Sequence, residues 1–162
     1  MTQEISLGAS KSLSNEISVY RQRIEKAIER ELDRFEDSAY YYPLKEALVG
    51  GKRFRPILLV LSYESVSDSK GDPYPAATAI ELIHLESLIH DDILDKDVSR
   101  RKGLSFHALH GYEMSLLSTD FVFGIILDLI SEYDDSEVIK EFSRATRLMS
   151  EGELKELSVS RV

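Results

Sequence analysis

Residues 81–95 read ELIHLESLIHDDILD, an apolar stripe at helical spacing that ends in three carboxylates. At roughly 100° and 1.5 Å per residue, Asp91 and Asp95 lie about 40° apart around a helix axis and about 6 Å apart along it. Like charges at this spacing destabilise a helix by about 0.2–0.5 kcal/mol unless a cation relieves the repulsion. Two explanations are open here: a Mg²⁺ site that binds a diphosphate, or carboxylates that decorate a solvated helix end.

Two basic clusters flank this stretch. GKRFR occupies residues 51–55, directly after Gly50, and SRRK occupies residues 99–102. Guanidinium and ammonium groups suit phosphate oxygens, and glycine lets the backbone approach an anion closely. Each cluster alone is typical of a solvated surface, but together with the carboxylates they indicate a protein that binds two phosphorylated substrates.

The rest of the chain has mostly helical periodicity, without the alternation typical of β-strands. Pro43 fits a helix start and Gly50–Gly51 a helix stop. The run ILLVLSYESV at 57–66 favours a buried helix, although periodicity alone would also allow a strand. Further helices are expected over residues 17–32, 74–95, 112–131 and 136–158, with a turn-rich linker at 67–75. We expect one all-α domain over residues 1–162 with about six helices, in which residues 1–10 are flexible.

Composition excludes several classes of function. The 162 residues carry a net charge of −9, which disfavours a nucleic-acid partner because phosphate-backbone binding needs a cationic surface. The chain has no cysteine, which fits a reducing compartment, so we expect a cytoplasmic protein. The longest apolar run, FVFGIIL at 121–127, is too short for a membrane span, and no targeting pattern is visible at the N-terminus.

Three motifs in order give the chain a specific resemblance to a known family. GGKRFRP at 50–56, ELIHLESLIHDDILD at 81–95 and SRRKGLSFHALHG at 99–111 resemble the trans-isoprenyl diphosphate synthases, or polyprenyl synthetases. The resemblance implies a helical bundle of the isoprenoid (terpenoid) synthase type around a deep cavity, commonly assembled into dimers. It also implies condensation of an allylic diphosphate with isopentenyl diphosphate, through ionisation, attack of the isopentenyl double bond and proton loss.

The same resemblance implies roles for individual residues. Asp91 and Asp95 would bind Mg²⁺ that bridges the allylic diphosphate, Asp92 would support them, and Arg100 would contact that diphosphate. The expected isopentenyl diphosphate site comprises Lys52, Arg55, His84 and Arg101, and Arg53 is expected among the substrate-binding residues.

His84 is the residue for which two explanations stay balanced. On a half-apolar stripe a histidine is usually a satisfied core residue, yet His84 lies two helical turns before Asp91 on the same stripe. His107 and His110 have no such partner pattern, so we expect them to be structural.

The chain also departs from the family pattern. Lys102, Leu104 and Thr119 replace residues that are usually glycine, proline and glycine. Full family members are about twice as long, and the second DDxxD motif is missing here. We therefore expect an enzyme subunit that is inactive alone and forms a hetero-oligomer or homodimer, with a second prenyltransferase subunit supplying the other motif. There are two alternatives. The chain could be a noncatalytic regulatory or interaction subunit, or it could be a fragment of a full-length synthase. GGKRFRP argues against a terpene cyclase, which needs no second diphosphate site.

Product length depends on the helix surface one turn below the metal site. Ser87 lies four residues before Asp91, and its neighbour is Glu86. Family members that stop at short products tend to carry bulky aromatic residues at or beside this position. The small Ser87 therefore predicts products longer than fifteen carbons, with Glu86 pointing about 140° away from Asp91.

Overall fold

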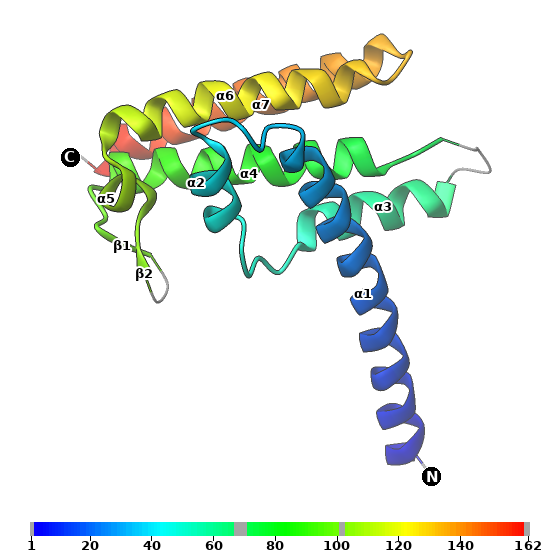
Figure 1. The fold of residues 1–162 in the computed structure, drawn as a ribbon. Helices are drawn as coiled ribbons and strands as arrows, with labels where there is room; N and C mark the ends of the chain where they lie inside the picture. The colour runs from blue at the N-terminus through cyan, green and yellow to red at the C-terminus, as the bar shows by residue number, and fades with distance from the viewer. Residues whose placement is uncertain (1, 67–70, 101–102, 161–162) are drawn as a thin grey trace.

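The structure is a computed structural model that describes residues 2–66, 71–100 and 103–160 (Figure 1). Within these residues the chain forms seven helices and one short strand pair. They are α1 (Thr2–Asp33), α2 (Tyr41–Ala47), α3 (Phe54–Val66), α4 (Tyr74–Leu94), β1 (Ser99–Arg100), β2 (Gly103–Leu104), α5 (Phe106–His110), α6 (Tyr112–Ser131) and α7 (Ser136–Ser160). The prediction of an all-α bundle is confirmed.

The helix that carries the aspartates, α4, lies at the centre of the bundle. Figure 1 shows α6 and α7 on one side of it, and α3 and α1 on the other. Its buried apolar residues meet those of α6 in one continuous core, which includes Leu82, Leu85, Ile89, Val122, Ile126 and Leu129. Because α4 packs on several sides, its direction is fixed, and so are the positions of the polar groups along it.

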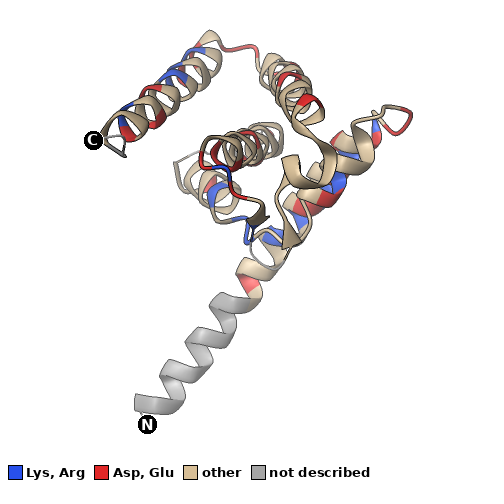
Figure 2. Ribbon diagram, turned by 90° about the vertical axis from the view of Figure 1, so that its left-hand side faces the viewer, with Lys and Arg blue, Asp and Glu red and all other residues tan. Residues whose placement is uncertain are grey.

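The helix α6 is apolar and lacks lysine and arginine, whereas α7 has mixed charges along its length (Figure 2). Among the described residues, α6 is the one helix long and apolar enough to cross a membrane. However, Val122, Ile125 and Ile126 are almost fully buried in the core that α6 shares with α4. We therefore assign α6 as a core helix.

The predicted ends of α4, α6 and α7 agree with the structure within two residues, whereas α1 begins at Thr2 and not at residue 17. The run at 57–66 is helical, as part of α3, and α2 begins two residues before Pro43. The strand pair, with Ser99 opposite Leu104 and Arg100 opposite Gly103, was not predicted. Strands of two residues are too short to show the alternation by which a sequence indicates β-structure. Residues 2–10 lie within α1, and their expected flexibility stays a prediction.

The chain reverses direction directly after α4. Lys96 has a left-handed backbone, with φ of 60°. The Asp97 N–H donates to the Asp92 carbonyl at 2.9 Å, and the Lys96 N–H donates to the Ile93 carbonyl at 3.3 Å. These two bonds form a Schellman motif, which satisfies helix-end carbonyls. The reversal brings Arg100 back alongside the last turn of α4.

Candidate active site

The three aspartates of DDILD point in different directions. Asp92 is buried, and its two carboxylate oxygens accept hydrogen bonds from Arg100 Nε at 2.8 and 2.9 Å. Asp91 is half-buried, and Asp95, at the C-cap of α4, is exposed. The structure thus pairs Asp92 with Arg100 and leaves Asp91 and Asp95 as the carboxylates on the other side of the helix end.

A carboxylate from α7, Glu153, joins this pair. The charge of Asp91 is the main cause of a raised pKa at Glu153, followed by burial, Glu156, a hydrogen bond with Asp91 and the charge of Asp95. Asp91 Oδ1 is buried without a hydrogen-bond partner among the described residues. A cation would relieve both the repulsion and the unpaired oxygen. Sequence reasoning missed Glu153 because it lies on another helix.

The carboxylates form an open site. In the described parts of the chain, no three His, Asp or Glu side chains are close enough to enclose a metal ion by themselves. Mg²⁺ usually takes only one or two carboxylates and completes its shell with water and phosphate oxygens. One or two of the neighbouring carboxylates Asp91, Asp95 and Glu153 would be enough for such an ion, so the donor chemistry fits a hard divalent cation.

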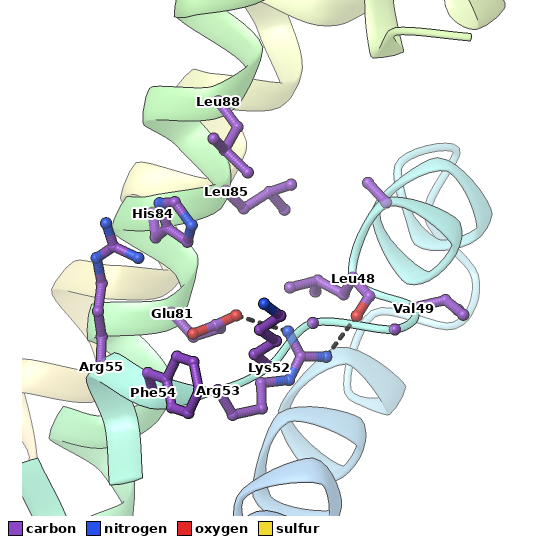
Figure 3. A pocket seen from close by; sticks show the side chains of 13 residues that line it. Leu48, Val49, Lys52, Arg53, Phe54, Arg55, Glu81, His84, Leu85 and Leu88 are labelled. Carbon is purple, nitrogen blue, oxygen red and sulfur yellow. Dashed lines mark hydrogen bonds and ion pairs between the residues drawn. The ribbon is translucent and has the colours of Figure 1, made fainter. Parts of the chain in front are cut away.

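The GGKRFR loop and α4 enclose a pocket of about 440 Å³ (Figure 3). Lys52 and Arg55 are exposed and His84 is half-buried, and all three line this pocket. In Figure 3 the side chain of Arg55 extends along α4 toward His84. The structure brings these three side chains to one pocket, and their expected contacts with isopentenyl diphosphate stay a prediction.

Arg53 behaves differently from the other cations of the loop. It is only 3% exposed, and protein groups surround its guanidinium. Nε and Nη2 donate to the two oxygens of Glu25 at 3.1 Å each, Nη1 donates to Glu81 Oε1 at 2.6 Å, and Nη2 also donates to the Leu48 carbonyl. Burial lowers the pKa of Arg53, but the hydrogen bonds with Glu25 and Glu81 outweigh it, so the pKa is raised. Arg53 was predicted to bind substrate, and the structure gives its guanidinium these other partners instead.

A second pocket lies next to the first, between the end of α2 and the end of α4. It has a volume of about 560 Å³, shares Leu85 and Leu88 with the first pocket, and reaches Asp92 and Arg100. Arg101 and Lys102, the remaining cations of SRRK, lie outside the described residues. The hollow surface therefore extends from the GGKRFR loop to the end of α4.

A mostly apolar groove of about 720 Å³ runs between α3, α4 and α7. Ser87 lines it together with Phe142 and Met149. Met149 precedes Glu153 by one helical turn, just as Ser87 precedes Asp91, so the groove leads to the carboxylates. Glu86 does not line this groove. Burial, and then the charge of Asp120 on α6, raise its pKa to about 7.

The described residues thus form a helical bundle with a cationic pocket and, beside it, a mostly apolar groove. The family model described as polyprenyl synthetase matches residues 37–161. The chain therefore belongs to the polyprenyl synthetase family of prenyltransferases.

Individual relatives agree with this assignment. A short chain isoprenyl diphosphate synthase from Methanocaldococcus jannaschii is 35% identical over 144 residues, which are 85% of this chain and 44% of the relative. A geranyltranstransferase structure from Thermotoga maritima superposes with a TM-score of 0.83 at 30% identity, covering 91% of this chain and 57% of that one. A polyprenyl synthase from Caulobacter crescentus, solved with calcium and isoprenyl diphosphate, gives a TM-score of 0.74 at 30% identity and covers 86% and 44%. The chain spans about half the length of the curated relatives it matches.

Proposed function

We propose that this chain supplies the substrate-binding half of a trans-prenyltransferase that condenses an allylic diphosphate with isopentenyl diphosphate. One observation carries the proposal: His84 lines both the cationic pocket, with Lys52 and Arg55, and the mostly apolar groove. Asp91 follows His84 by two helical turns and therefore lies on the same side of α4. The cationic pocket would complement one diphosphate, the carboxylates with a bound cation would complement the other, and the groove would complement a hydrocarbon tail.

The cationic pocket binds isopentenyl diphosphate in this account. Lys52 and Arg55 neutralise its diphosphate, and His84 contacts it from α4. Arg101 is proposed as a further contact on the strength of the family resemblance. The pocket thereby holds the isopentenyl double bond near the end of the groove, where the allylic carbon would lie.

Asp91 and Asp95, with Glu153 beside them, would hold Mg²⁺ in the completed enzyme. When bound, that ion would supply positive charge that stabilises a departing pyrophosphate. Asp92 does not face the metal in this account. It orients Arg100 through the paired bonds to Nε, which leaves the outer nitrogens of that guanidinium to contact the diphosphate.

The groove receives the growing chain. Ser87 is small and leaves the groove open one turn below Asp91, whereas Glu86 faces α6, so we propose products longer than fifteen carbons. In a completed enzyme, Ser87→Phe should shorten the products, as read by chromatography of the dephosphorylated alcohols. An unchanged distribution would place the chain-length barrier elsewhere.

The complete enzyme requires a second carboxylate motif, which we propose comes from a partner prenyltransferase subunit in a cytoplasmic hetero-oligomer. Exposed apolar side chains such as Phe123 and Leu127 on α6 favour an oligomer, which a homodimer of this chain could also provide. The half-length match also supports a second candidate, a noncatalytic regulatory subunit. The two differ in whether this chain itself binds both diphosphates.

Calorimetric titration of the whole chain tests the proposed function. Isopentenyl diphosphate should bind without Mg²⁺, and Lys52→Ala should weaken that binding by about tenfold or more, as for a lost charged hydrogen bond. Farnesyl diphosphate should bind only when Mg²⁺ is present, and Asp91→Asn should abolish this Mg²⁺-dependent binding. Each variant serves as the control for the other ligand. If neither diphosphate binds, the regulatory-subunit alternative replaces the proposal.

A further inference from the structure

Arg53 occupies an unusual backbone conformation for its residue type. Its φ is +57°, in the left-handed region, which costs an L-residue about 1–2 kcal/mol. Residues persist there when their surroundings hold them. The contacts of its side chain must therefore offset the strain of its backbone.

The guanidinium of Arg53 connects the loop to three helices. Glu25 lies on α1, Glu81 on α4, and the Leu48 carbonyl at the end of α2. Figure 3 shows this guanidinium beneath the loop, between Glu81 and Leu48. Lys52 directly precedes Arg53, and Arg55 follows two residues later, so a backbone fixed at Arg53 sets the direction of both exposed cations.

The two glycines of the loop serve different purposes. Gly50 has φ of +79°, and a Cβ there would meet nothing within 4 Å. Gly51 has no such φ, but a Cβ there would overlap Arg53 Nη1 and come within 3.2 Å of Glu81 Oε1. Gly50 is therefore needed for its backbone conformation, and Gly51 for the space that the Arg53 guanidinium occupies.

We propose that Arg53 is a positioning residue, which holds Lys52 and Arg55 toward the pocket through its contacts with Glu25, Glu81 and Leu48. Gly51 is required because that guanidinium lies against its Cα. The inference rests on the proposed function of the pocket. It replaces the predicted direct contact between Arg53 and substrate with an indirect role.

A double-mutant cycle tests the proposal, using the affinity of the whole chain for isopentenyl diphosphate. Gly51→Ala displaces the guanidinium and should weaken binding by about tenfold. Arg53→Lys keeps the charge beside Glu81 but loses the branched contacts, and it should weaken binding by a similar factor. The double variant should bind no more weakly than Arg53→Lys alone, because the shorter lysine leaves room for the methyl group. Far-UV circular dichroism checks that each variant keeps its helix content.

Gly50→Ala is the matched control. An alanine at position 50 strains the backbone and does not touch the guanidinium. Gly50→Ala should therefore lower the affinity by the same factor whether residue 53 is arginine or lysine. If Gly51→Ala behaves the same way, or leaves the affinity unchanged, the positioning role is wrong. A double variant that fails to fold would also contradict it. If Lys52→Ala binds as tightly as the native chain, the proposed pocket itself fails, which is a separate outcome.

Discussion

The carboxyl group of Glu86 is half-buried on α4, facing away from the apolar groove. Burial and the charge of Asp120 raise its pKa from 4.5 to about 7. A raised carboxyl pKa means that the folded chain binds this proton more tightly than the unfolded chain. Folding is therefore favoured at pH below about 4.5, and this contribution is lost as the pH rises to about 7.

Glu86→Gln should remove this pH dependence. At pH 8 the variant should be more stable than the native chain by about 2 kcal/mol, and at pH 4 the two should be nearly equal. Urea unfolding followed by circular dichroism at both pH values measures the difference. Glu29→Gln, an exposed change on α1, is the control and should leave the difference near zero. Equal stability of Glu86→Gln and the native chain at pH 8 would contradict the burial of this carboxyl.

At the scale of residues, the sequence predicted the groups that face the pocket better than those that support it. Lys52 and Arg55 could be found because they belong to the GGKRFRP motif, and His84 because it lies on the same helical stripe as Asp91. Nothing local indicated that Arg53 turns inward, because its partners Glu25 and Glu81 lie 28 residues away on either side. Only tertiary packing decides which cation of such a cluster is buried.

At the scale of elements, the chain reversal at the end of α4 depends on a residue type that rarely adopts the backbone conformation required there. Lys96 occupies the left-handed position of the Schellman motif, where glycine is usual. Its side chain is exposed, so a substitution removes no core packing. The reversal it makes is nonetheless needed, because Arg100 must return to Asp92.

Lys96→Gly should therefore stabilise the chain by about 0.5–1 kcal/mol, since the relieved backbone strain exceeds the entropy that glycine adds to the unfolded state. The midpoint of urea unfolding measures the gain. Lys140→Gly, at an exposed position inside α7, is the control and should destabilise by about 1 kcal/mol. The two substitutions would shift the midpoint in the same direction only if Lys96 did not hold the left-handed conformation.

The long helices could be predicted because their apolar stripes repeat over several turns, as in α4 and α6. The strands β1 and β2 and the five-residue helix α5 were not predicted, because each is too short for its apolar pattern to repeat. They follow instead from the chain reversal after Lys96 and from the pairing of Arg100 with Asp92.

At the scale of the whole molecule, the chain presents half of a bundle whose family members are about twice as long. The sequence indicated this through the single DDxxD motif, and the coverage of the relatives agrees. The position of Glu153 beside Asp91 could not be predicted, because it depends on how α7 packs along α4. With carboxylates on only one side of a bound diphosphate, ionisation should be slow unless another surface faces them.

Prenyl transfer from farnesyl diphosphate to labelled isopentenyl diphosphate, in the presence of Mg²⁺, tests the central claim most directly. The chain should be assayed alone and fused in register to the remainder of the Methanocaldococcus jannaschii relative, which supplies the missing half. We expect no transfer by the chain alone, transfer by the fusion, and loss of transfer in the fusion with Asp91→Ala. Transfer by the chain alone, or undiminished transfer by the Asp91→Ala fusion, would contradict the claim that this chain contributes one half of the active site.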